Sequence, residues 1–190
     1  MSSHPGRVRI IGGSLRNSRL AVPELPGLRP TPERVRETLF NWLAPVIHGA
    51  RVLDLCAGTG ALGIEALSRG AAQVRFVEPD ARAAAALRAN LARLKTAGGE
   101  VTTSSAQAFL RGAPRAHDLA FLDPPFALDL WSELAGALEA GWLTAQAWVY
   151  VECPRAAAPA LPAGWACHRE GVAGEVRYAV YRREPARTPC

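Results

Sequence analysis

Two short segments of this sequence combine a carboxylate with residues that shape tight turns, and each follows a run of apolar residues. The first, Asp54–Gly63, reads DLCAGTGALG, and the second, Asp123–Phe126, reads DPPF. Ligands of open α/β sheets bind beyond the carboxyl ends of the strands, so we expect both segments to line one crevice. Glycines allow a ligand to approach the backbone closely, and carboxylates attract cations and accept hydrogen bonds from amines.

The glycine-rich segment allows two interpretations. Gly58, Gly60 and Gly63 satisfy the G-x-G-x-x-G pattern of dinucleotide-binding folds, and Glu78 follows where it can bind ribose hydroxyls. Asp54 favours a different ligand, because its carboxylate would repel a pyrophosphate and attract the cationic amino-acid end of S-adenosyl-L-methionine. That cofactor, bound without metal, would contact a set of six residues: Asp54, Ala57, Gly58, Thr59, Gly60 and Glu78. A nicotinamide-dependent oxidoreductase is the alternative.

The DPPF segment has the residue types needed to present an exocyclic amine to a methyl donor. The lone pair of an aromatic amine is delocalised, so Asp123 would orient the amine and take up its developing charge or proton. Pro124 and Pro125 fix the backbone and leave carbonyl oxygens that can accept amine hydrogens. Phe126 offers a face on which a base can stack once it has left its own stack or where it is already unpaired. The segment alone could also be a turn that ends a strand.

The charge of the chain is concentrated near its start. Lys and Arg number 22 against 17 Asp and Glu, which gives a net charge of +5. Residues 1–36 carry this whole excess, and Lys95 is the only lysine. Arginine suits phosphate and guanine edges, so a basic arm on a neutral body predicts nucleic-acid binding. The candidate RNA-binding residues are Arg7, Arg9, Arg16, Arg19, Arg29, Arg34 and Arg36. A solvated arm that aids solubility is the alternative.

Strand and helix patterns alternate after residue 50, which predicts an α/β fold with a mostly parallel sheet covered by helices on both faces. Five apolar runs predict strands: Val52–Leu55, Val74–Val77, Val101–Ser104, Leu119–Leu122 and Trp148–Val151. Helices are expected near Ala61–Arg69, Ala81–Leu94, Gln107–Leu110 and Leu130–Ala140. Two further strands, Cys167–Val172 and Val176–Arg182, are expected to form an antiparallel hairpin at one side.

A separate pattern precedes this alternation. Arg7–Ile11 and Arg19–Val22 are short β-prone runs that predict a hairpin, and prolines make the connector that follows. Thr31 is expected to cap a helix whose first residue is Pro32. We therefore predict a basic N-terminal β-hairpin arm and connector at residues 1–30 and a methyltransferase domain at residues 31–190.

Composition bounds the class of protein. A chain of 190 residues with 49% hydrophobic and 21% charged residues is typical of one globular domain. No uncharged stretch is long enough for a membrane helix, and the first six residues lack a signal-peptide pattern, so we expect a soluble cytoplasmic protein. The four cysteines show no metal-ligand spacing, and we predict no metal site.

Taken together, these motifs resemble the bacterial 16S rRNA (guanine-N2)-methyltransferases of the RsmD family, over nearly the whole chain. The resemblance runs through Arg9–Gly13, Leu28–Thr31, Arg34–Leu43, Asp54–Gly63 and Asp123–Phe126, and it ends at Val172–Gly174. The R-P-T…R-V-R-E-T-L-F-N segment is its most specific part. The sequence departs from the family at the arm turn, where Asn17 replaces a glycine, and at Cys56, where an aromatic residue is common.

The resemblance implies a class I, Rossmann-like methyltransferase with a seven-stranded sheet. It implies that the substrate is guanine 966 of 16S rRNA, within a small-subunit particle. Ser105 and Ala106 stand where many relatives of the wider class contact the adenine, although the usual acid is missing. Another amino-directed RNA or DNA methyltransferase remains an alternative, and so does a non-enzymatic RNA-binding module, which would leave the DPPF segment unexplained.

Overall fold

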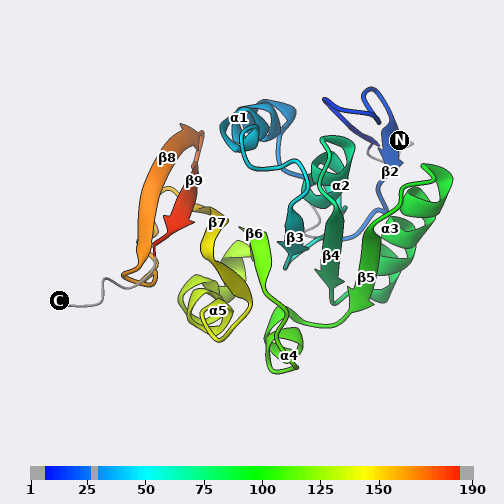
Figure 1. The fold of residues 1–190 in the computed structure, drawn as a ribbon. Coiled ribbons are helices and arrows are strands. Elements are labelled where there is room, and N and C mark those ends of the chain that lie inside the picture. Colours follow the sequence, from blue (N-terminus) through cyan, green and yellow to red (C-terminus); the bar gives the residue numbers. More distant parts are fainter. Residues whose placement is uncertain (1–6, 27–29, 185–190) are drawn as a thin grey trace.

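The computed structural model of this protein describes residues 7–26 and 30–184 and contains one seven-stranded sheet, in the order β5-β4-β3-β6-β7-β9-β8 (Figure 1). The strands from β5 to β7 run parallel, and β9 and β8 pair antiparallel at one side. The α/β fold and the C-terminal hairpin are therefore confirmed. The strands are β3 (Arg51–Asp54), β4 (Gln73–Glu78), β5 (Gly99–Thr103), β6 (His117–Leu122), β7 (Leu143–Pro154), β8 (Trp165–Ala173) and β9 (Val176–Arg183).

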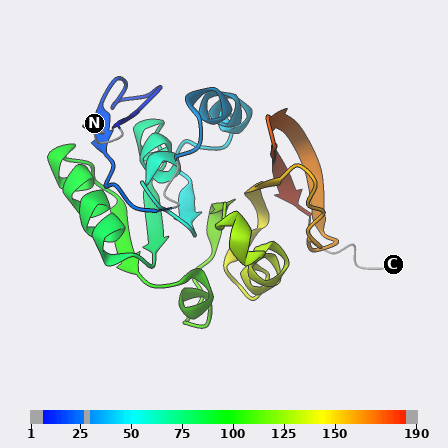
Figure 2. The same ribbon diagram turned by 180° about the vertical axis from the view of Figure 1, so that it is seen from behind.

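Helices cover both faces of this sheet (Figures 1 and 2). One face carries α1 (Glu33–Leu43), α2 (Ala61–Ser68) and α3 (Ala81–Arg93). The other carries α4 (Ala106–Leu110) and α5 (Trp131–Leu138), and a short 3-10 turn, η1 (Phe126–Leu128), lies between β6 and α5. The buried apolar residues accordingly form two clusters, one on each face. This two-sided burial explains why the central strands are continuous apolar runs.

The strand register determines which side chains meet at the carboxyl edge of the sheet. Phe121 of β6 pairs with Asp54 of β3 on one side and with Tyr150 of β7 on the other. Alternate residues of a strand share a face, so Glu152, two residues after Tyr150, points to the face covered by α1. Asp123 follows the end of β6 directly and lies beside Glu152. Carboxylates from neighbouring strands are thus brought together at one edge.

The N-terminal hairpin is also confirmed, with β1 (Arg7–Arg9) and β2 (Arg19–Ala21) pairing antiparallel. Asn17 has a φ of 68°, the left-handed conformation that asparagine tolerates in place of glycine. The side-chain amide of Asn90 in α3 donates to the Ala21 carbonyl and accepts from the Ala21 amide. Arm residues such as Leu20 are buried in the same cluster as α1 and α2, so the hairpin packs firmly on the body. The division into two domains stays a prediction.

The start of α1 differs from the expectation. Pro32 is the residue that flanks the helix, and α1 begins at Glu33 without a side-chain cap. The Thr31 hydroxyl instead donates to Glu152 Oε2 at 3.4 Å. The predicted cap was wrong because a buried carboxylate from β7, distant in sequence, competes for that hydroxyl. Across the two described ranges, no helix has the length and apolar character needed to cross a membrane.

Candidate cofactor and catalytic site

The glycine-rich loop connects β3 to α2 at the carboxyl edge. Gly60 has a φ of 75° and precedes α2, and a Cβ there would collide with Leu87 of α3. Gly63 lies against the ring of Phe76, and its amide donates to Asp54 Oδ2 at 3.0 Å. A glycine at each position thus allows the helix to start close to the sheet. The loop that results can bring backbone amides against a ligand.

Two carboxylates hold this loop. Asp54 is only 2% exposed, and burial raises its pKa to about 7; the Gly63 amide opposes that shift, and the nearby charge of Glu78 adds to it. Glu78 accepts hydrogen bonds from the amides of Gly58 and Asp80, each at 2.8 Å. Glu78 was predicted at the end of the second strand, and it lies there, with its carboxylate against the loop.

Ser105 and Ala106, which the resemblance implied as adenine contacts, lie at the start of α4. The Ser105 hydroxyl oxygen accepts from the Ala108 amide at 3.2 Å and so caps that helix, while Ala106 is buried. The loop residues Ala57 and Thr59 are also buried. The structure therefore places the predicted cofactor residues along the ends of β3, β4 and β5.

The DPPF segment ends β6 beside this loop. Asp123 is half-buried, and its pKa is raised well above the ordinary value, first by burial and then by the charges of Glu152 and Asp54. Pro124 is buried, whereas Phe126 is 39% exposed, with its ring centroid 5.8 Å from that of Trp131. Phe126 thus keeps an accessible face, as a stacking platform requires.

Glu152 belongs to the same group of carboxylates, and the sequence analysis missed it. It is 7% exposed, and its Oε2 accepts hydrogen bonds from the hydroxyls of Tyr150, at 2.7 Å, and Thr31. The indole of Trp131 donates to its backbone carbonyl at 2.7 Å. A signal was present, since a single acid directly follows the apolar run Trp148–Val151, but it carries no motif.

The Cys56 thiol lies among these carboxylates. Burial raises its pKa above the ordinary range, and the charges of Asp123, Asp54 and Glu78 add to the effect in that order. The thiol is therefore held protonated and is a poor nucleophile. The charges of three carboxylates reach this one thiol, so the ends of β3, β4 and β6 bring their acids close together.

This group of acids lacks a compensating cation among the described residues. Within the described residues, none of Asp54, Glu78, Asp123 and Glu152 forms an ion pair with lysine, arginine or histidine. Such a donor set fits a ligand with a sulfonium, an ammonium and a ribose, and it would repel the pyrophosphate of a dinucleotide. In the same part of the chain, no cluster of three or more His, Cys, Asp or Glu side chains could hold a metal ion.

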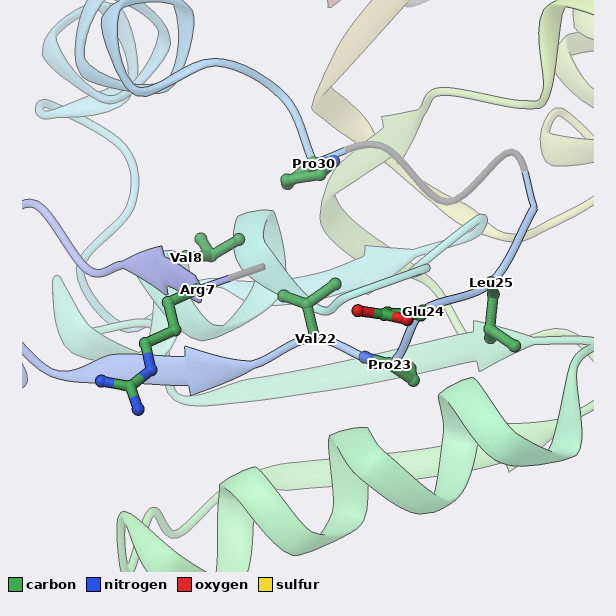
Figure 3. Close-up of a pocket in the computed structure, with 7 residues that line it drawn as sticks. All are labelled: Arg7, Val8, Val22, Pro23, Glu24, Leu25 and Pro30. Carbon is green, nitrogen blue, oxygen red and sulfur yellow. The ribbon is translucent and has the colours of Figure 1, made fainter. Parts of the chain in front are cut away.

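The predicted RNA-binding arginines occupy three kinds of position. Four of them are exposed and form no ion pair with any described residue: Arg7, Arg16, Arg19 and Arg34. Arg9 is exposed and pairs with Glu33 at 2.7 Å, and Arg29 lies outside the described residues. Arg7 lines a hollow of about 230 Å³ between the hairpin and the connector. Its guanidinium is directed away from the other lining residues (Figure 3).

Arg36 corrects the sequence interpretation. Its side chain is 1% exposed and donates to the carbonyl oxygens of Thr31 and Arg9 at 3.1 and 3.0 Å. Its guanidinium lies 3.5 Å from Glu65 Oε2, and that carboxylate is fully buried. Charge alone placed Arg36 with the RNA-binding arginines, but its position on the inner face of α1 directs it into the core.

Comparison with known proteins identifies the family. The family model described as Conserved hypothetical protein 95 matches residues 8–182. Ribosomal RNA small subunit methyltransferase D of Escherichia coli K12 is 50% identical over 184 residues, which cover 96% of this chain and 93% of that protein. The chain belongs to the RsmD family. The resemblance seen in the sequence is therefore confirmed.

Solved structures agree with this membership. The structure of yhhF from Escherichia coli has a TM-score of 0.88 and 47% identity, and the match covers 94% of this chain and 99% of that one. An RNA methyltransferase from Salinibacter ruber, solved with S-adenosyl-L-homocysteine, shares the fold at a TM-score of 0.64 and 20% identity, over 85% of this chain and 97% of its own. As a member of the RsmD family, the chain is a methyltransferase that depends on S-adenosylmethionine.

Proposed function

We propose that this protein methylates the exocyclic N2 of guanine 966 in 16S rRNA, within a cytoplasmic small-subunit particle. The observation that carries the proposal is the position of the DPPF segment at the end of β6, beside the glycine-rich loop and in a group of acids without a cation among the described residues. Asp123 provides a carboxylate for the amine, and Phe126 provides an exposed ring for the base. The name of the Escherichia coli relative supports the choice of a small-subunit RNA.

The cofactor would lie along the ends of β3 and β4. When bound there, S-adenosylmethionine would supply the methyl group of its sulfonium and would leave as the neutral thioether. Asp54 and the loop hold the amino-acid end, and Glu78 accepts from the ribose hydroxyls in addition to the amides it already binds. The contact set is the one predicted: Asp54, Ala57, Gly58, Thr59, Gly60, Glu78, Ser105 and Ala106.

The acceptor side of the crevice belongs to the DPPF segment. Asp123 accepts one N2 hydrogen and removes that proton as the nitrogen–carbon bond forms, so no covalent enzyme intermediate is needed. The raised pKa of Asp123 makes its carboxylate a stronger base for this step. The Pro124 carbonyl accepts the second N2 hydrogen, Pro125 fixes the turn, and Phe126 stacks on the guanine, which must leave its stack or be unpaired already to reach the site.

The arm supplies contacts to the RNA backbone. Arg7, Arg16, Arg19 and Arg34 are exposed and free of ion pairs within the described chain, so their guanidiniums are available to phosphates. Arg9 would exchange Glu33 for a phosphate, and Arg29 is assigned from charge alone. Arg36 is excluded from this surface because it is buried.

Nucleoside analysis tests the proposal directly. The small-subunit rRNA segment that contains position 966 is isolated from cells with and without the gene, digested and examined by mass spectrometry, and loss of N2-methylguanosine from that segment is the expected result. Purified protein and labelled S-adenosylmethionine should restore the mark on particles from the deletion strain. A methyl group on a ring carbon, a ribose oxygen or an adenine would refute the assignment, and the last result would indicate another amino-directed methyltransferase.

A further inference from the structure

Glu152 and Asp123 are neighbours at the carboxyl edge of the sheet, and only Asp123 belongs to a recognised motif. Leu122 of β6 pairs with Val151 of β7, so the next residue of each chain segment is Asp123 and Glu152. The electrostatic influence of Glu152 on Asp123 agrees with their closeness. Two acids therefore lie side by side next to the DPPF segment, where the proposed function places the acceptor amine.

The two oxygens of Glu152 have different surroundings. Oε2 accepts from the Tyr150 hydroxyl at 2.7 Å and from the Thr31 hydroxyl at 3.4 Å, and Tyr150 is fully buried. No described residue donates a hydrogen bond to Oε1. In the described chain, Thr96 Oγ1 is the only fully buried side-chain polar atom that lacks a hydrogen-bond partner. Glu152 Oε1 also lacks a partner, so it is not fully buried. One oxygen anchors the carboxylate, and the other is available.

The hydrogen-bonding edge of guanine matches this arrangement. Guanine presents N1–H and two N2 hydrogens, and the proposed site offers Asp123 and the Pro124 carbonyl for the two N2 hydrogens. A third acceptor beside Asp123 would face N1–H. Adenine presents an unprotonated N1 next to its amine, so a carboxylate at the same place would repel it.

We propose that Glu152 Oε1 accepts the N1–H of the target guanine and thereby selects guanine over bases whose N1 carries no proton. This inference rests on the proposed methylation of guanine N2. Glu152 is then a specificity-determining residue that touches the substrate. Tyr150 and Thr31 are positioning residues, because they act only by orienting its carboxylate.

The electrostatics of the pair favour such a ligand. Burial raises the pKa of both carboxyl groups, and neither has a cation among the described residues. Guanine brings three N–H donors into a place where two acids otherwise repel each other. A base that places a lone pair against Glu152 gains one hydrogen bond fewer and adds repulsion.

The test compares guanine with 2-aminopurine, which keeps the N2 amine but has no proton on N1. Small-subunit particles are reconstituted from ligated 16S rRNA with either base at the target position, and single-turnover methylation is measured with labelled S-adenosylmethionine. The wild-type protein is expected to prefer guanine by about 100-fold or more. In Glu152→Gln the preference should fall below about tenfold, because the amide can turn its NH₂ toward the bare N1.

Controls separate this inference from the function on which it rests. Glu133→Gln, at an exposed position of α5, should keep the wild-type preference. S-adenosylhomocysteine affinity, measured by calorimetry, reports whether Glu152→Gln is folded. Equal wild-type rates on both bases would overturn the inference whatever the variant does, and so would an unchanged preference in folded Glu152→Gln. Wild-type protein that methylates neither particle would instead refute the proposed function.

Discussion

Glu65 in α2 and Glu152 in β7 are both buried glutamates, but they have opposite surroundings. Glu65 accepts from the amides of Ile11 and Gly12 and from Arg69, each at 2.8 Å, and Arg36 lies 3.5 Å away. Two arginines and two amides therefore satisfy one carboxylate. Glu152 receives two hydroxyl hydrogen bonds and has another acid, Asp123, as its charged neighbour.

The difference separates architecture from function. A buried charge that is fully paired stabilises the arrangement of the elements around it, and removing a partner is costly. A buried charge without a counter-ion lowers the free energy of unfolding, and such groups concentrate at sites where a ligand binds or a reaction takes place. The Glu65 network joins the arm to the body, whereas the acids at the ends of β3, β4, β6 and β7 have no cation among the described residues.

The largest expected effect is on catalysis. Asp123→Ala should lower single-turnover methylation by about 10²–10⁴-fold, the range for a positioned acid–base group. The free energy of unfolding should stay the same or rise, because the variant removes one of two neighbouring like charges. Both quantities are measured, by labelled methyl transfer and by urea denaturation. Full activity of Asp123→Ala would show that this unpaired acid has no catalytic role. Glu133→Ala, at an exposed position of α5, is the matched control.

The paired network predicts the reverse pattern. Arg36→Gln should lower the free energy of unfolding by about 3–5 kcal/mol, because it leaves Glu65 with one cation fewer in the core. Arg34→Gln, two residues earlier on the exposed side of α1, should change it by less than about 0.5 kcal/mol. Urea denaturation of both variants measures the contrast. Similar stabilities for the two would show that the buried pair contributes nothing.

The unpaired acids should also make stability depend on pH. Asp54 has a folded-state pKa of about 7, above the ordinary 3.8, so the folded protein binds more protons than the unfolded chain between these values. Stability of the ligand-free protein should therefore fall as pH rises from about 4 to about 7, by at most about 1.4 kcal/mol per pH unit for one group. Thermal unfolding at several pH values measures it. Asp54→Asn should flatten the curve, and an unchanged slope would contradict the raised pKa.

The smallest effect concerns the exposed arginines. Replacing Arg16 and Arg19 by glutamine should reduce the salt dependence of RNA binding by about 1.5 in log–log slope, since each phosphate contact contributes about 0.7–0.9. Stability should not change, because neither side chain forms an ion pair with a described residue. A matched pair, Arg111 and Arg115, is exposed on the α4 side of the sheet. Equal effects from both pairs would mean that overall charge, and not the arm, binds RNA.

Local sequence patterns were sufficient to predict the two motifs. They failed to predict the role of a side chain whose partner is distant in the sequence. The loop after β3 and the DPPF turn are encoded by neighbouring residues, so their elements were predicted closely. Arg36 looked like its exposed neighbour Arg34, because nothing near it in sequence shows that Glu65 lies opposite. Thr31 was expected to cap α1 for the same reason, since its true partner is 121 residues away.

Glu152 shows the same limit at the site itself. Its strand was recognised, but β7 extends from Leu143 to Pro154, well beyond the predicted Trp148–Val151. Only the register with β6 places the acid beside Asp123, and register is a property of the assembled sheet. The carboxylate pair therefore became visible once the strands were aligned.

Helix α2 has a further consequence for how two large substrates are brought together. Its first residue follows Gly60 of the cofactor loop, and the side chain of Glu65 in its middle holds the turn of the arm. Eight residues of helix span only about 12 Å. Helix α2 therefore fixes the distance between an RNA bound by the arm and a methyl donor bound by the loop. The enzyme would select its nucleotide by this distance.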